Sequence, residues 1–287
     1  MSAAGMSART GAAEAPSGKD AAYENFPVGS WLLSATLRPH VAVFYAFARA
    51  IDDVADSPAL TPEEKIFRLE GFERALLGQG SEDPAYAKGH AMRRTLLQTE
   101  VTTRHCQDLI DAFKQDAIKK RYADWDELLD YCMRSAAPVG RFLLDLHGGS
   151  HNGYGPADAL CNALQVINHL QDCQEDFRVL DRVYLPIAWM ETAGTTVEAL
   201  GETAATPALR QVLDRALDGV EALLDEAAPL PARLRSRRLA MEAGAILKIA
   251  WTLAKRLRRE DPLAGRVALS KADYVLCCAQ GAVAAAF

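Results

Sequence analysis

Helical spacing of apolar residues along almost the whole chain limits the folds that this sequence can adopt. Stretches in which apolar residues recur with a helical period are separated by short segments rich in Gly and Pro, and no segment shows the strict alternation of a half-buried strand. A helix with one apolar face buries that face against other helices. The sequence therefore predicts one all-α domain of about eight to ten helices.

The sequence predicts different structures for the two ends of the chain. Residues 1–22 are rich in Ala, Gly and Ser and lack the apolar run of a signal peptide, which predicts a disordered leader. No change of composition marks a linker after residue 23, so residues 23–287 are predicted to form the single domain. The apolar stretch 274–287 is shorter than the roughly 20 residues of a membrane-spanning helix. It is predicted to pack as a terminal helix, with peripheral contact at the inner face of the membrane as the alternative.

Composition narrows the function and the compartment. With a net charge of −6 and a pI near 5.6, the chain is not expected to bind nucleic acid. Two basic runs, 233–238 and 255–259, are expected to be solvated helix faces, and an anionic small ligand or a membrane surface is the alternative partner. The six cysteines form no C-x-x-C pair, which predicts reduced thiols in a cytoplasmic protein.

One predicted helix, residues 40–56, carries acids on its polar side. At about 100° per residue, Tyr45, Arg49, Asp52 and Asp56 fall on the side opposite the apolar residues. Asp52 and Asp56 lie one turn apart, so their carboxylates project in the same direction. These four residues are called the first acidic stripe.

A second predicted helix repeats this arrangement. Its polar side, called the second acidic stripe, consists of Gln165, Asn168, His169, Asp172 and Asp176. Asp172 and Asp176 are again one turn apart, and Arg49 is the sole base on either stripe. Like charges at this spacing destabilise a helix by roughly a few tenths of a kcal/mol, and no base at the same spacing offsets that cost here.

Two interpretations of the stripes stay open from the residues alone. Each stripe is either a solvated helix face or one half of a divalent-metal site. Mg²⁺ binds through carboxylates, waters and phosphate oxygens of a substrate, so two facing pairs would suit a diphosphate held between them. His40 and His169 lack the spacing of metal ligands, so zinc is not expected.

Three segments of the chain are similar to the motifs of one enzyme family. They are FYAFARAIDDVAD at 44–56, YCMRSAAPVG at 131–140 and LQVINHLQDCQEDFRVLDRVYLP at 164–186. Together they resemble the squalene and phytoene synthases, which are all-α enzymes that act on prenyl diphosphates. The resemblance implies a helical bundle of the isoprenoid-synthase type, in which apolar helix faces enclose a central cavity for a C30 chain.

Within this family, the segments NFPV, LRPHV, NHLQDC and LDRVYLP most resemble the bacterial branch of the hopanoid route. That branch implies presqualene diphosphate as the substrate, Mg²⁺ as the cofactor, and hydroxysqualene and diphosphate as the products. Neighbouring enzymes of the same pathway are further expected partners. Two alternatives remain, a head-to-head synthase that joins two prenyl diphosphates and a non-catalytic scaffold of the same family.

The resemblance also implies roles for individual residues. It assigns Mg²⁺ binding and catalysis to Asp52, Asp56, Asp172 and Asp176, and it places Tyr45 and Tyr131 beside the carbocation, which an aromatic face attracts. It assigns substrate contacts to Arg49, Gln165, Asn168 and Arg266. Asp53 and Glu175 lie at the edges of the stripes and are expected to be solvated or to support the ligands.

The chain departs from the family pattern at several positions. Gln171 stands where Arg commonly precedes the first aspartate of the second motif, and Asn25-Phe26 stands where condensing members have Ser before the Phe. Ser135 replaces a typical Val in the middle segment. These changes disfavour the condensation of two substrates, while the intact aspartate pairs disfavour a scaffold.

Overall fold

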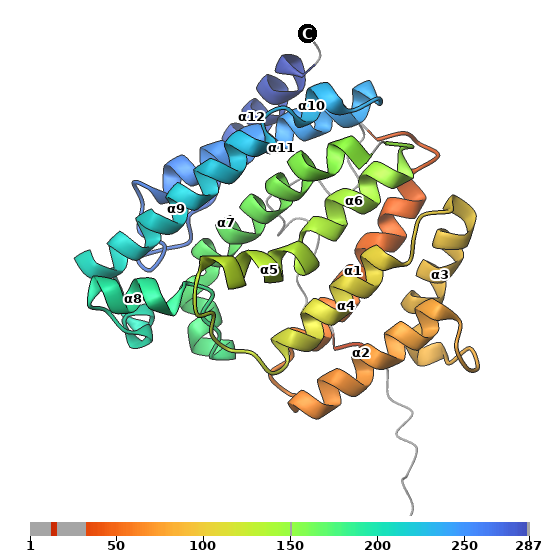
Figure 1. Cartoon of the computed structure of the whole chain (residues 1–287), viewed down its shortest axis with the longest axis horizontal. Helices are drawn as coiled ribbons and strands as arrows, with labels where there is room; N and C mark the ends of the chain where they lie inside the picture. Colours follow the sequence, from red (N-terminus) through yellow and green to blue (C-terminus); the bar gives the residue numbers. More distant parts are fainter. Residues whose placement is uncertain (1–12, 16–32, 150, 286–287) are drawn as a thin grey trace, which may run out of the picture.

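The computed structural model describes residues 13–15, 33–149 and 151–285 (Figure 1). Most of the predicted leader and the Asn25-Phe26 pair therefore lie outside the described residues. Within the leader, Ala13 is buried and its carbonyl accepts a hydrogen bond from Arg68 at 3.2 Å. Glu14 forms an ion pair with Lys88 at 2.6 Å. Both contacts tie this short piece of the leader to the helical domain.

Helices supply the secondary structure of the described ranges. The α-helices are α1 (Arg38–Asp56), α2 (Pro62–Leu77), α3 (Ala87–Thr99), α4 (Arg104–Asp116), α5 (Trp125–Ser135), α6 (Ala137–Leu146), α7 (Tyr154–Leu180), α8 (Ile187–Ala193), α9 (Pro207–Ala227), α10 (Leu230–Arg233), α11 (Arg237–Leu257) and α12 (Lys271–Ala284). The short 3₁₀ helices are η1 (Pro84–Tyr86), η2 (His151–Gly153) and η3 (Val197–Gly201). Within these ranges there is no strand, and the predicted all-α fold is confirmed.

The described residues form more helices than the sequence predicts. The excess comes from short helices in segments whose Gly and Pro content indicates loops, because α8 spans seven residues and α10 only four. Periodicity becomes recognisable only over windows of about 11–18 residues, so helices of one or two turns give no clear signal.

Helix α2 has capping residues at both of its ends, and both are recognisable in the sequence. The Thr61 hydroxyl accepts a hydrogen bond from the Glu64 N–H at 3.3 Å, and the Glu64 carboxylate accepts one from the Thr61 N–H at 3.0 Å. Such a capping box satisfies two N–H groups that have no partner inside the helix, and one cap stabilises a helix by about 1 kcal/mol. The helix ends at Gly78, whose φ of 70° suits a residue without a Cβ atom.

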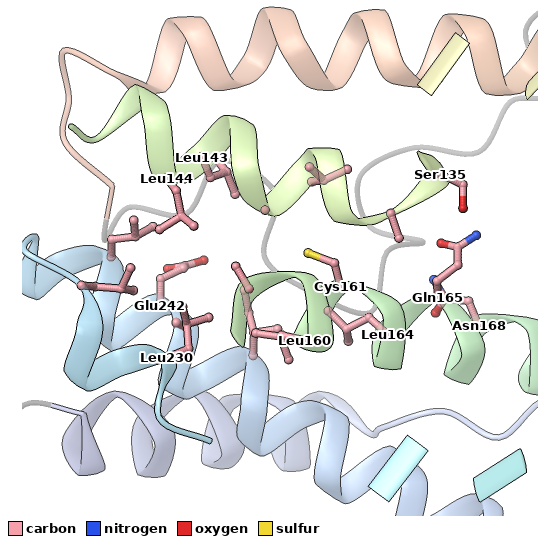
Figure 2. A pocket seen from close by; sticks show the side chains of 18 residues that line it. Ser135, Leu143, Leu144, Leu160, Cys161, Leu164, Gln165, Asn168, Leu230 and Glu242 are labelled. Carbon is pink, nitrogen blue, oxygen red and sulfur yellow. The ribbon is translucent and has the colours of Figure 1, made fainter. Parts of the chain in front are cut away.

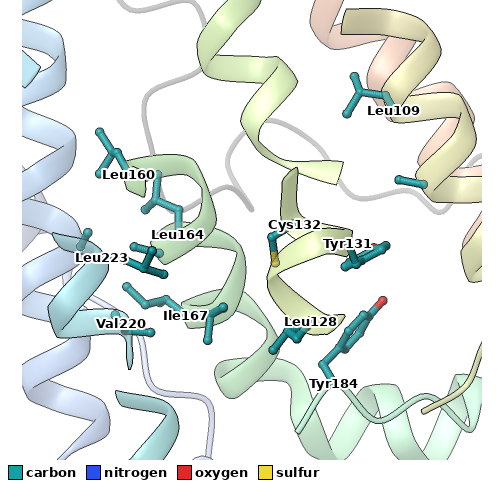
Figure 3. Close-up of a cluster of buried hydrophobic side chains, with 14 of the residues drawn as sticks. Leu109, Leu128, Tyr131, Cys132, Leu160, Leu164, Ile167, Tyr184, Val220 and Leu223 are labelled. Atoms are coloured by element: carbon teal, nitrogen blue, oxygen red, sulfur yellow. The ribbon is translucent and has the colours of Figure 1, made fainter. Parts of the chain in front are cut away.

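The long helix α7 lies at the centre of the bundle. Figure 1 shows α5, α6 and α7 between α1–α4 on one side and α9–α12 on the other. Buried residues occur on several faces of α7, because α5, α6, α9 and α11 all pack against it. In Figure 3, Ile167 of α7 lies between Val220 and Leu223 of α9 and Leu128 and Cys132 of α5.

Aromatic contacts fix α1 against its neighbours. Phe44 stacks on Phe142 of α6 with ring centroids 4.0 Å apart. Phe47 meets Phe72 of α2 edge-on at 6.3 Å, and both rings are fully buried. Because one side of α1 is held in this way, its polar residues are presented on a defined side.

Two further observations concern the thiols and the membrane. All six cysteines are free, and four of them are buried, in line with the predicted reduced thiols. None of the helices in the described ranges combines the length and the apolar content needed to cross a bilayer.

The backbones of α11 and α12 approach closely at a pair of glycines. A Cβ atom on Gly244 would lie 2.4 Å from the carbonyl oxygen of Gly281, whereas a Cβ atom on Gly155 of α7 would meet nothing within 4 Å. A backbone atom cannot yield as a flexible side chain does, so a methyl group at Gly244 must separate the two helices.

We therefore expect Gly244→Ala to lower the free energy of unfolding by about 1–3 kcal/mol through overpacking. Gly155→Ala is the matched control, and it should leave stability unchanged or raise it, since Ala is better than Gly in a helix by about 1 kcal/mol. Urea unfolding followed by circular dichroism measures both. Equal stability of the two variants would contradict the close contact of α11 and α12.

Candidate active site

The first acidic stripe borders a cavity. Tyr45, Arg49 and Asp52 of α1 line an outer cavity with about 1030 Å³ of empty space. Arg49 forms ion pairs with Asp52 at 3.2 Å and with Asp53 at 3.0 Å. Asp53 is buried, so of its two expected roles the solvated one does not hold, and its ion pair places it as a support of Arg49.

Asp56, the last acid of the first stripe, is held by Arg182. The Asp56 carboxylate accepts a hydrogen bond from Arg182 at 2.8 Å, and the same guanidinium donates to the Asp116 carbonyl oxygen at 3.2 Å. The chain turns back after α7 because Asp181 adopts a left-handed φ of 51°. This reversal brings Arg182 against α1 and α4. Sequence patterns gave no signal for Arg182, which lies near the end of the motif at 164–186.

A buried polar cluster lies behind Arg182. The Tyr131 hydroxyl donates to the Asp116 carboxylate at 2.6 Å. Burial raises the pKa of Asp116 to about 6, against the opposing effect of the Arg182 charge. The ring of Tyr184 stacks on His169 at 3.4 Å, and burial lowers the pKa of His169 to about 3, so that this imidazole is neutral. Figure 3 shows Tyr131 and Tyr184 next to each other.

Tyr45 and Tyr131, to which the family resemblance assigns the same role, lie in different surroundings. Tyr45 lines the outer cavity, whereas Tyr131 lines neither this cavity nor the inner one described below. Tyr131 is almost completely buried, with its hydroxyl directed at Asp116. His169 also departs from its predicted face, since it lies in the buried cluster and not on the polar side of α7.

The remaining residues of the second acidic stripe lie near polar and charged groups of the site. Gln165 and Asn168 line the same outer cavity as Asp52. Asp172 lies 3.9 Å from Arg266, and Asp176 lines a small pocket together with Arg182. The structure thus brings the two stripes and Arg266 to one region of the molecule.

Gln171 stands where family members commonly have Arg, and its side chain is directed at the segment between α11 and α12. Its side chain is buried and donates a hydrogen bond to the Val267 carbonyl oxygen at 2.5 Å. Gln171 is therefore committed to the segment that joins α11 to α12.

The carboxylates fit a metal that is partly held by a substrate. Among the residues that the structure describes, no three His, Cys, Asp or Glu side chains gather closely enough to bind a metal ion by themselves. Asp52 and Asp172 are partly exposed, with 31% and 28% of their side-chain surfaces accessible. Such a donor set suits Mg²⁺, which keeps several waters and takes further oxygens from a phosphate group.

An inner cavity continues the outer one between α6, α7, α10 and α11. It contains about 830 Å³ of empty space, and its wall is mostly apolar (Figure 2). The two cavities share Ser135, Val139, Leu143, Gln165, Asn168, Glu242 and Ile246. Together they form one tunnel that is charged at α1 and apolar towards α10. Such a tunnel suits a ligand with an anionic head and a long apolar chain.

The fold and the site thus define an all-α enzyme architecture for an apolar chain with an anionic group. The family model of squalene/phytoene synthases matches residues 20–273. The chain belongs to the squalene/phytoene synthase family, and it is an enzyme of isoprenoid biosynthesis.

Individual relatives are similar over most of the chain. A hydroxysqualene synthase from Rhodopseudomonas palustris is 41% identical over 93% of this chain and 90% of the relative. A hydroxysqualene synthase from Zymomonas mobilis is 40% identical over 91% of this chain and 88% of the relative. The crystal structure of squalene synthase HpnC from Alicyclobacillus acidocaldarius superposes with a TM-score of 0.70, at 31% identity, over 81% of this chain and 87% of that one.

The raised pKa of Asp116 gives a testable dependence of stability on pH. The folded state binds this proton more tightly than the unfolded state does, so the free energy of unfolding contributed by Asp116 falls as pH rises from about 4 to about 6. The expected fall is on the order of 2–3 kcal/mol. Asp116→Asn should remove this component from the stability curve measured by urea unfolding between pH 4 and 7.

Asp111→Asn is the control, because Asp111 lies on the same helix but is exposed. Its curve should run parallel to that of the wild type. A parallel curve for Asp116→Asn as well would show that the Asp116 carboxyl does not titrate in this range.

Proposed function

We propose that this enzyme converts presqualene diphosphate into hydroxysqualene and diphosphate with the help of Mg²⁺. The observation that supports this most is the similarity, over about nine-tenths of the chain, to two hydroxysqualene synthases. The continuous tunnel with a charged outer end and an apolar inner end agrees with a substrate that has a diphosphate head and a C30 chain.

In this proposal, the two stripes act on the diphosphate. Asp52 and Asp56 from α1 and Asp172 and Asp176 from α7 would hold Mg²⁺. Bound Mg²⁺ neutralises the negative charge that grows on the leaving group. Arg49 and Arg266 lie beside these acids and would contact the phosphate oxygens, while Gln165 and Asn168 would orient the head of the substrate.

The reaction balances without an added reductant. The C–O bond to the diphosphate breaks, and its electron pair leaves with the diphosphate. The cyclopropylcarbinyl cation rearranges in the tunnel, with the ring of Tyr45 at the outer wall, where an aromatic face attracts a cation by up to about 2 kcal/mol. A water oxygen then forms the new C–O bond and loses one proton.

A head-to-head synthase that joins two prenyl diphosphates is the second candidate. The similarity in fold and sequence to the squalene synthase HpnC favours it. The similarity to two hydroxysqualene synthases at about 40% identity weighs against it.

A product analysis separates the candidates. Purified enzyme with Mg²⁺ and without NADPH is incubated with presqualene diphosphate and, separately, with farnesyl diphosphate. We expect hydroxysqualene from presqualene diphosphate and no condensation of farnesyl diphosphate. Condensation of farnesyl diphosphate would establish the second candidate, and no turnover of either substrate would favour a non-catalytic scaffold.

The metal assignment is tested at Asp172. Asp172→Asn should lower the Mg²⁺-dependent turnover by about 100-fold or more, because the metal contributes several kcal/mol of charge stabilisation. Glu175→Gln is the matched control on the same helix, since Glu175 is exposed. Circular dichroism should show that both variants fold. Full turnover of Asp172→Asn would refute the assignment.

A further inference from the structure

The segment between α11 and α12 is held by two hydrogen bonds directly after Arg266. Val267 is buried, and its carbonyl oxygen accepts the hydrogen bond from Gln171 at 2.5 Å. The next carbonyl oxygen, that of Ala268, accepts a hydrogen bond from Arg256 at 2.7 Å. Residues 266–270 are not helical, and these two bonds help to fix the backbone next to Arg266.

One turn of α7 carries both Gln171, which bonds the Val267 carbonyl, and Asp172, which lies near Arg266. Gln171 precedes Asp172, and Arg266 lies 3.9 Å from the Asp172 carboxylate. Successive residues of a helix point about 100° apart, so Gln171 reaches the backbone behind Arg266 while Asp172 faces its guanidinium.

We propose that Gln171 is a positioning residue that holds Arg266 at the second acidic stripe, where its guanidinium contacts the diphosphate. This inference rests on the proposed function, since it assumes that a diphosphate binds between the stripes.

A double-mutant cycle tests this role with inorganic diphosphate and Mg²⁺ as the ligand, measured by titration calorimetry. Gln171→Ala should weaken diphosphate binding by about 3- to 10-fold, the effect of one side-chain hydrogen bond. Arg266→Ala should weaken it at least as much. Adding Gln171→Ala to Arg266→Ala should have no further effect, because Gln171 acts only through Arg266.

Gln174→Ala is the matched control. Gln174 is also a glutamine of α7 that donates to a backbone carbonyl, but its acceptor is Glu202 in another segment, so this variant should bind diphosphate normally. Gln171→Met keeps the volume without the donor and should behave as Gln171→Ala does if folding is intact. Normal binding by both Gln171 variants, or an equal loss in the Arg266→Ala background, would overturn the inference. A wild type that binds no diphosphate would overturn the proposed function itself.

A second observation concerns the inner cavity. Among the described residues that line it, Glu242 of α11 is the one charged side chain. It is 5% exposed and lines both parts of the tunnel. Figure 2 shows its carboxylate among Leu143, Leu144 and Leu160, away from the polar group of Ser135, Gln165 and Asn168 at the other end.

Glu242 places a carboxylate in this otherwise apolar wall. Its negative charge would attract a carbocation on the bound chain, and its oxygens accept hydrogen bonds from water. We infer that Glu242 holds the water that captures the cation and accepts its proton. The water oxygen forms the C–O bond, the O–H electron pair stays on that oxygen, and the proton passes to Glu242 and later to solvent. This inference also rests on the proposed function.

The test measures diphosphate release and lipid products separately, with presqualene diphosphate as the substrate. Glu242→Gln keeps the shape of the side chain but cannot take the proton. Diphosphate release should change little, because ionisation precedes water capture, whereas hydroxysqualene should fall at least about 100-fold relative to alkenes formed by proton loss. Glu242→Asp should restore part of the alcohol.

Lys248→Gln, an exposed charge change on the same helix, should leave the products unchanged. Unchanged product ratios in Glu242→Gln would overturn the role of Glu242. Loss of diphosphate release in a folded Glu242→Gln would also overturn it, by placing Glu242 in the ionisation step. A wild type that makes no hydroxysqualene would overturn the proposed function together with this inference.

Discussion

The ion pairs of Arg182 connect the first acidic stripe to the buried centre of the protein. Arg182 is 2% exposed, and its guanidinium bonds the Asp56 carboxylate and the Asp116 carbonyl oxygen. A buried guanidinium is tolerated only where acids and carbonyl oxygens surround it. Arg182 lies two residues after the end of α7, so its bond to Asp56 links the ends of α1 and α7. The orientation of the two acidic stripes towards each other therefore depends on the bond between Arg182 and Asp56.

The two ends of the tunnel differ in polarity. At its outer end, Arg49 and Asp52 are partly exposed and suit an anion with its metal. Towards α10, the walls from α6, α7 and α11 are apolar except for Glu242. Charge is thus concentrated where a leaving group would depart, and the space in which a cation would rearrange has mostly apolar walls.

Much of the fold was predictable because its signals are local. The long helices, the cap of α2 and the two acid pairs follow from spacing at about 100° per residue. The short helices α8 and α10 were missed because one or two turns carry too little periodicity. Leu164 and Ile167 illustrate another limit. Both are apolar residues of α7, yet Leu164 lines the inner cavity and Ile167 packs in the core, a difference that no residue type encodes.

The sequence by itself determined which side chains share a helix face, since that depends only on the backbone geometry of a few turns. It thereby determined both acid pairs and the family to which the chain belongs. Only the tertiary structure decided their partners. Asp56 meets Arg182 across 126 residues, and Gln171 meets Val267 across 96. Such contacts depend on how whole helices pack and where the chain reverses between them, and no local pattern in the sequence specifies that packing.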